Sequence, residues 1–224
     1  NNNQGTDTKV AFDGKSGANR GDQFAGFPSI DMVLTKDTAY IATQKGIYAI
    51  NRIGNAKATA GVPKLAKEEG DLVKSIKAIR ERHKAAVKAN KADDLAKVTA
   101  ELNRATARLA AIAKEKEDLN AGRVTWFVSR EQLGPLAVSG ELGTLALAGE
   151  TLFAGGNGYV LSVNAVSGQL VSMYGLSDNA LGLAVADERL FVSTDSGAIH
   201  CLGEQAAQGK PRKVTEAAKP VALG

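Results

Sequence analysis

The chain has 224 residues, which is enough for one large domain or two small ones. Its formal net charge is +4, its hydrophobic fraction is 44% and its aromatic fraction is only 5%, which is low for a protein with a large all-β core. No run of about 18 apolar residues occurs, so the sequence excludes a transmembrane helix.

Residues 1–30 are rich in Asn, Gly, Asp and Gln, and they predict a loop-rich N-terminal segment. Only Val10–Phe12 and Phe24–Phe27 offer apolar side chains that could pack. The chain begins at Asn1 without a methionine and without a basic-then-apolar leader, as an excised or processed segment does. We therefore expect a piece of a larger polypeptide.

Three later segments share one pattern, in which three strands are separated by a polar turn and a glycine-containing turn. They are Met32–Asn51, Leu145–Asn164 and Leu183–Gly203. Leu152 and Leu190 are 38 residues apart, close to the period of about 40 residues that a four-stranded propeller blade has. The shared positions are an aromatic residue of the middle strand (Tyr40, Phe153, Phe191) and a glycine of the second turn (Gly46, Gly158, Gly197).

Residues 63–122 lie between the first two of these segments and predict an antiparallel helical hairpin. Pro63 suits the first turn of a helix, residues 90–94 supply a reversal, and Gly122 ends the second helix. Apolar residues recur at alternating steps of three and four, which is the a/d pattern of a coiled coil. Each arm of about 26 residues should be about 40 Å long. The predicted seam includes Leu72, Ile76, Ile79, Leu102, Leu109 and Ile112.

The charge excess of the chain lies in this segment. Residues 63–122 contain 14 Lys and Arg against 10 Asp and Glu, whereas the remainder contains 14 of each. A basic segment favours acidic partners. Nucleic acid is not an expected partner, because the segment lacks the interleaved aromatic residues that bind single strands.

The second repeated segment continues as SVNAVSGQLVSM, from Ser162 to Met173. At these residues the sequence resembles the PQQ-like, quinoprotein-type family of β-propeller repeats, whose blades typically end in the motif A-x-D-x-x-T-G-x-x-x-W. Asn164 stands where that family has Asp, and Met173 replaces the Trp. The resemblance implies that Val124–Ser129 is the outer strand of the first blade, and that Trp126 is the residue that docks it on the next blade.

The expected fold is therefore mainly β, a partial β-propeller of PQQ-like four-stranded blades with an inserted antiparallel α-helical coiled-coil hairpin. Propellers need about four to eight blades to close, so the remaining blades must come from the same polypeptide, another subunit or further copies. The expected parts are a loop-rich segment at 1–30, blades at 31–62 and 123–203, the hairpin at 63–122, and a linker or tail at 204–224.

The sequence holds no complete catalytic constellation. The two histidines are His83, on the predicted seam, and His200, which alternates with Cys201 in a strand and so points to the opposite face of the sheet. This argues against a shared metal site. No C-x-x-C-H haem motif occurs, and a single cysteine excludes the vicinal disulfide that the resemblance associates with PQQ-dependent dehydrogenases. We expect no cofactor and no metal in this chain.

The expected function is a non-catalytic protein-interaction or scaffolding module that forms part of a larger β-propeller, with the hairpin contacting a partner subunit. One alternative is a cofactor-poor piece of a PQQ-dependent dehydrogenase whose active-site residues lie on other blades. A second alternative is a structural cell-surface protein. The resemblance implies a periplasmic or extracytoplasmic location.

Overall fold

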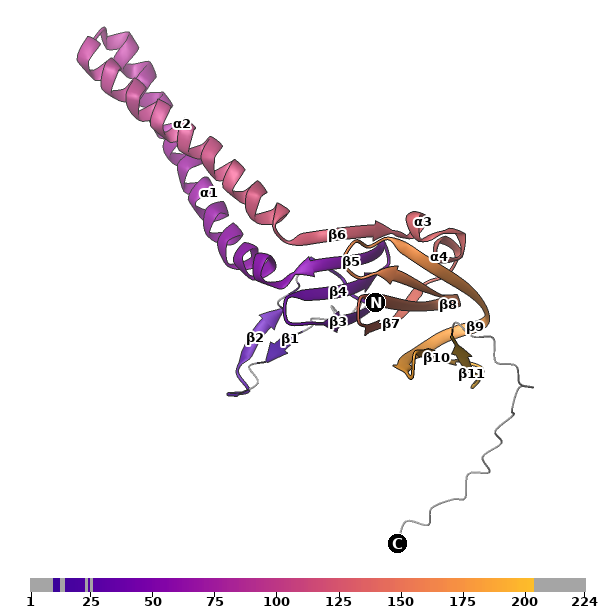
Figure 1. Ribbon diagram of the computed structural model, residues 1–224. Helices are drawn as coiled ribbons and strands as arrows, with labels where there is room; N and C mark the ends of the chain where they lie inside the picture. Colours follow the sequence, from indigo (N-terminus) through magenta and orange to yellow (C-terminus); the bar gives the residue numbers. More distant parts are fainter. Residues whose placement is uncertain (1–9, 13–14, 23, 25, 204–224) are drawn as a thin grey trace, which may run out of the picture.

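The computed structural model describes residues 10–12, 15–22, 24 and 26–203 (Figure 1). The predicted tail at 204–224 lies outside these residues, as do residues 1–9, 13–14, 23 and 25 of the predicted N-terminal loop. Within the described residues, no helix is both long and apolar enough to span a membrane. A first antiparallel pair is formed by β1 (Val10–Phe12) and β2 (Asn19–Asp22).

Two larger antiparallel sheets make up the body of the molecule. The four-stranded sheet has the order β3-β4-β5-β6, and the five-stranded sheet has the order β11-β10-β9-β8-β7. The strands of the first are β3 (Asp31–Leu34), β4 (Thr38–Thr43), β5 (Gly46–Asn51) and β6 (Val124–Ser129). Those of the second are β7 (Leu142–Ala148), β8 (Thr151–Asn164), β9 (Leu170–Ala186), β10 (Arg189–Thr194) and β11 (Ile199–Leu202).

The prediction of a partial β-propeller is wrong. The described residues form two antiparallel sheets of four and five strands, and they do not form a propeller. The sequence pattern places a strand end at Gly158, but this glycine lies inside β8, a strand of 14 residues, with a φ of +81°. The 17-residue β9 pairs with β8 through its first part and with β10 through its second part. The second and third repeats therefore belong to one sheet instead of two separate blades.

A helical hairpin connects β5 to β6, as the sequence predicts. It consists of α1 (Arg52–Ala89) and α2 (Ala92–Ala121), and it projects away from both sheets (Figure 1). The strand predicted at Val124–Ser129 is confirmed with the same bounds, and it pairs with β5 across the insertion. After β6, two short helices, α3 (Arg130–Leu133) and α4 (Pro135–Ser139), lead to the second sheet.

The predicted start of the hairpin at Pro63 is wrong, because α1 begins at Arg52 and Pro63 lies inside it. Proline in a helix interior removes a backbone hydrogen bond, which is why it favours a helix start in a sequence pattern. Asn51 caps the earlier start, since its Oδ1 accepts a hydrogen bond from the backbone N–H of Gly54 at 2.8 Å. The reversal at Asn90 is confirmed, with this residue in the left-handed conformation at a φ of 54°.

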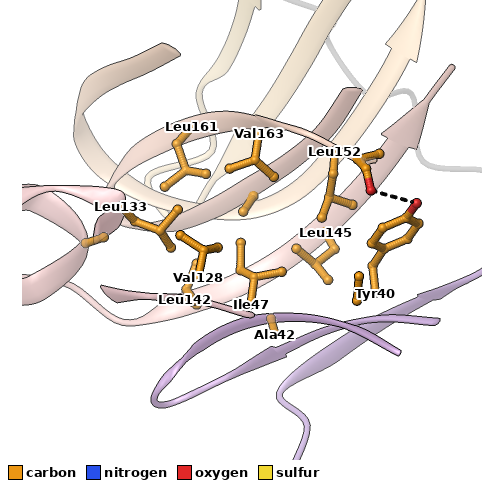
Figure 2. Close-up of a cluster of buried hydrophobic side chains, with 14 of the residues drawn as sticks. Tyr40, Ala42, Ile47, Val128, Leu133, Leu142, Leu145, Leu152, Leu161 and Val163 are labelled. Carbon is orange, nitrogen blue, oxygen red and sulfur yellow. Dashed lines mark hydrogen bonds between the residues drawn. The ribbon is translucent and has the colours of Figure 1, made fainter. Parts of the chain in front are cut away.

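The main core lies between the two sheets (Figure 2). Strands β4 and β5 contribute one side of it and strands β7 and β8 contribute the other, because alternate residues of each strand point to the same face. The fully buried members include Ala42, Ile47, Leu133, Leu152, Tyr159 and Val163. The opposite face of the first sheet is also covered, since Phe24 and Phe27 pack against Ala39, Ile41 and Ile50.

Candidate interaction surfaces

Trp126 joins the two sheets. Its indole Nε1 donates a hydrogen bond to the backbone oxygen of Ala165, in the turn after β8, at 3.0 Å. The hydroxyl of Tyr40 donates to the same oxygen at 3.2 Å, and the two rings lie 6.0 Å apart. The ring also lies against Gly168, where an added Cβ would approach it to 2.7 Å. Trp126 and Tyr40 therefore fasten β6 and β4 to the second sheet, and burial raises the pKa of Tyr40.

The structure does not bring the three repeat aromatic residues together. Phe153 is half-buried in a second cluster with Val160, Leu190 and Val192. Phe191 lies on the other face of its sheet, paired with Ala184 and Cys201. The predicted turn glycines have positive φ values, of +145° at Gly46, +81° at Gly158 and +81° at Gly197.

Near the second cluster, an open cleft separates β8 from the turn between β9 and β10. Its lining includes the hydroxyls of Ser162 and Ser172, 2.7 Å apart, and the side chains of Asp187 and Arg189. Among the described residues, no group of three or more His, Cys, Asp or Glu side chains is placed to hold a metal ion. His200 and Cys201 pair with neighbouring residues of β10, and Cys201 is exposed.

The six predicted seam residues are all buried or half-buried between the helices of the hairpin. Ile76, Ile79 and Ile112 have 7%, 2% and 0% of their surface exposed, which makes them the apolar centre of the contact between α1 and α2. The remaining three are half-buried: Leu72, Leu102 and Leu109. His83, the polar residue of the predicted seam, is also half-buried.

Ion pairs join α1 to α2 along one side of this seam. Arg108 is bidentate to Glu68, with Nε–Oε1 and Nη2–Oε2 distances of 2.8 and 3.0 Å. It also reaches Glu115 at 2.6 Å, while Arg82 pairs with Glu101 at 2.7 Å. The hydrogen bond from Arg108 lowers the pKa of Glu68, and the two glutamates raise the pKa of Arg108. This network was not predicted, because the pairing of residues 40 positions apart depends on how the hairpin closes.

At the base of the hairpin, the two helices meet the first sheet at one point. The backbone N–H of Asn51 donates to the oxygen of Arg123 at 2.9 Å, and Arg123 Nε donates to Asn55 Oδ1 at 3.0 Å. The Arg123 guanidinium also lies 5.0 Å from the ring centre of Phe27. Gly54 contacts the backbone of Gly122 so closely that a Cβ there would lie 2.8 Å from its carbonyl carbon.

The hairpin, as the structure bounds it, is more basic than the sequence pattern suggests. Residues 52–121 contain 16 Lys and Arg against 10 Asp and Glu, a net charge of +6. The rest of the chain contains 12 basic and 14 acidic residues, a net charge of −2. The hairpin and the rest of the chain therefore carry net charges of opposite sign.

No family model matches this chain, and no curated protein matches it. Among solved structures, the chain is similar to the computationally designed Ika4 protein, with a TM-score of 0.39 and 9% sequence identity. The match covers 77% of this chain and 63% of that one, so the chain spans less than two thirds of its length. The resemblance to PQQ-like repeats remains a prediction.

Proposed function

We propose that this chain is a non-catalytic protein-interaction module, in which the two sheets form the body and the helical hairpin is the arm that contacts a partner. The main support for this proposal is that α1 and α2 project away from both sheets (Figure 1). A surface arm of this length that serves only the stability of the body would lie against it to bury apolar area.

The attachment of the arm supports this role. The contacts of Asn51, Arg123, Gly54 and Gly122 hold its base against the first sheet. The side chain of Arg52 also donates to the backbone oxygens of Thr35 and Lys36. An arm with a fixed direction presents its surface to a partner with little loss of orientational freedom on binding.

The charge of the arm supports an acidic partner. A net charge of +6 on a narrow hairpin raises the rate of association with a negatively charged protein surface. It also disfavours association with positively charged surfaces. The rest of the chain, with a net charge of −2, contributes no such attraction.

Site-specific photo-crosslinking tests this proposal in cells that make the protein. A photoreactive side chain at Val87, on α1 and 53% exposed, should form adducts with another protein. The matched control is Leu34 of β3, which is 52% exposed on the body. Adducts at Val87 and not at Leu34 support the proposal. Adducts at Leu34 alone contradict it, as does the absence of adducts both at Val87 and at Ser75, which lies on the side of α1 that carries Glu68.

A deletion variant gives a second test. Because β5 and β6 pair directly, at Ala49 with Trp126, a short turn can replace residues 53–123. We expect the sheets of this variant to keep their cooperative unfolding transition, measured by tryptophan fluorescence. Proteins that were crosslinked to the hairpin of the parent chain, when tagged, should no longer bind this variant.

A further inference from the structure

The hairpin has two different sides. Two residues along an α-helix rotate the side chain by about 200°, so a residue two positions before an ion-paired one lies on nearly the opposite side. Glu68 and Arg82 of α1, and Glu101, Arg108 and Glu115 of α2, mark the ion-paired side. The residues two positions before them mark the other side, which we call the open groove: Ala66, Arg80, Thr99, Thr106 and Ala113.

On α1, the open groove carries a row of three apolar residues and one arginine. Ala66, Val73, Arg80 and Val87 follow one another at steps of seven residues, which places them in line along the helix. Val73 and Val87 are 52% and 53% exposed, in contrast to the buried isoleucines of the seam. A second apolar row beside the seam is not needed to hold two helices together.

On α2, the facing row consists of small residues. Thr99, Thr106 and Ala113 also follow at steps of seven. The hydroxyl of Thr106 donates to the backbone oxygen of Leu102 at 2.8 Å, so its hydrogen-bonding need is met within the helix. Small side chains on one helix beside valines on the other leave room for the ridge of a third helix. From Ala66 to Val87 the row is about 32 Å long, the length of a helix of about 20 residues.

The rim of the open groove on α1 is basic. Lys77, Arg80 and Lys84 follow it towards the tip, and within the described residues Lys77 and Arg80 belong to no ion pair. Such a rim attracts acidic side chains that flank an apolar stripe. It disfavours a second copy of this chain, because pairing two open grooves would bring two basic rims together.

We infer that the open groove binds an amphipathic helix of a partner protein, with an apolar stripe at heptad spacing and acidic residues beside it. This inference rests on the proposed function and specifies its binding surface. The partner helix completes a three-helix bundle on the hairpin, and its acidic residues neutralise the rim formed by Lys77, Arg80 and Lys84.

A synthetic probe tests the groove on the full chain. The probe is a fluorescein-labelled 21-residue peptide of three heptads, with Leu at both core positions and Glu beside them, and its control is a scrambled peptide of the same composition. Fluorescence anisotropy at low salt should show binding of the heptad peptide only. Equal binding of both peptides overturns the inference, because charge alone then explains it.

Variants of the chain locate the binding surface. The double variant Val73→Ser and Val87→Ser should weaken binding roughly tenfold or more, since it removes two apolar side chains from the contact. Arg80→Glu should also lower the affinity for the peptide, and it should do so more at low salt than at high salt. The matched control is Ser75→Ala, on the side of Glu68, which should leave the affinity within twofold of the parent value. A control variant that binds as weakly as the double variant contradicts the inference.

Two further measurements separate this inference from the proposed function. Photo-crosslinking from Ser75 but not from Val87 keeps the hairpin as an interaction arm and overturns the open groove as its binding surface. Absence of adducts from both positions overturns both. Light scattering reports a second copy as the occupant: a concentration-dependent dimer that Val87→Ser dissociates also overturns the inference. Circular dichroism at 222 nm confirms that each variant keeps its helices.

Discussion

The sheets and the hairpin bury their residues to very different extents. In β4, five of six residues are buried, and they contribute to cores on both faces of the sheet. In the hairpin, five of the 38 residues of α1 and one of the 30 residues of α2 are buried. The body is therefore held by packing, whereas the arm is held by a narrow seam, by ion pairs and by its base. The surface of the arm is therefore available for binding, because few of its residues are buried to stabilise the arm itself.

The largest expected effect comes from the core of the body. Leu152→Ala removes a fully buried side chain from between the sheets and should lower the free energy of unfolding by about 3–5 kcal/mol. Urea unfolding followed by Trp126 fluorescence measures this loss. The helical signal at 222 nm should persist in part after the sheets unfold. Loss of both signals in one transition would show that arm and body are one cooperative unit.

The next effect concerns the base of the arm. Gly54→Ala places a Cβ against the backbone of Gly122 and should cost about 1–3 kcal/mol, because neither helix can retreat without breaking its contact with the sheet. Gly70→Ala is the matched control in the same helix, since a Cβ there meets nothing within 4 Å. It should raise the stability by up to about 1 kcal/mol. If both variants change the unfolding temperature equally, the contact between Gly54 and Gly122 does not determine the stability of the arm.

Alkaline pH should affect the body. Tyr159 is fully buried in β8, its hydroxyl has no hydrogen-bond partner within the described residues, and burial raises its pKa to about 12. The unfolded chain loses this proton near pH 10, so the folded state loses stability as the pH rises from 10 to about 12. After allowance for solvent screening, the loss should be about 1–2 kcal/mol. In Tyr159→Phe this part of the pH dependence should vanish, and urea midpoints between pH 9 and 11.5 test it.

Acidic pH should affect the arm, with the smallest effect of the four. The hydrogen bond from Arg108 lowers the pKa of Glu68, so the stability from this pair is present above the usual pKa of a glutamate. It is lost as the pH falls through the lowered value. The helical signal of the parent chain should therefore decline towards pH 3 more steeply than that of Glu68→Gln. Parallel declines would show that the pair contributes nothing measurable, as exposed ion pairs often do.

Local patterns predicted part of this structure well. The strand at Val124–Ser129 was predicted with its bounds because the first repeat lacks its last strand before the helical insertion. The seam was predicted because a heptad pattern needs no information beyond its own helix. The propeller was wrong because a repeated pattern does not show whether a strand ends at a glycine. At Gly158 the strand continues, and this joins two repeats into one sheet.

The open groove was missed for a different reason. A heptad analysis selects the strongest apolar row, and the seam through Ile76 and Ile79 satisfied it. The signal for a second row was present, since Val73 and Val87 are two heptads apart, but a sequence does not show which helix faces which. The bidentate contact of Arg108 with Glu68 shows which sides of α1 and α2 face each other, and it identifies the side of the hairpin that the ion pairs occupy.

The closure at Asn51 and Arg123 makes the arm an adjustable spacer. The backbone N–H of Asn51 and the oxygen of Arg123, at the two ends of the arm, are 2.9 Å apart from nitrogen to oxygen. The strands that precede and follow the arm, β5 and β6, pair directly with each other. The sheet therefore sets no limit on the length of the arm. Adding or removing seven residues in each helix would preserve the seam and move the tip by about 10 Å. Reach can thus vary independently of the fold, in steps of two helical turns.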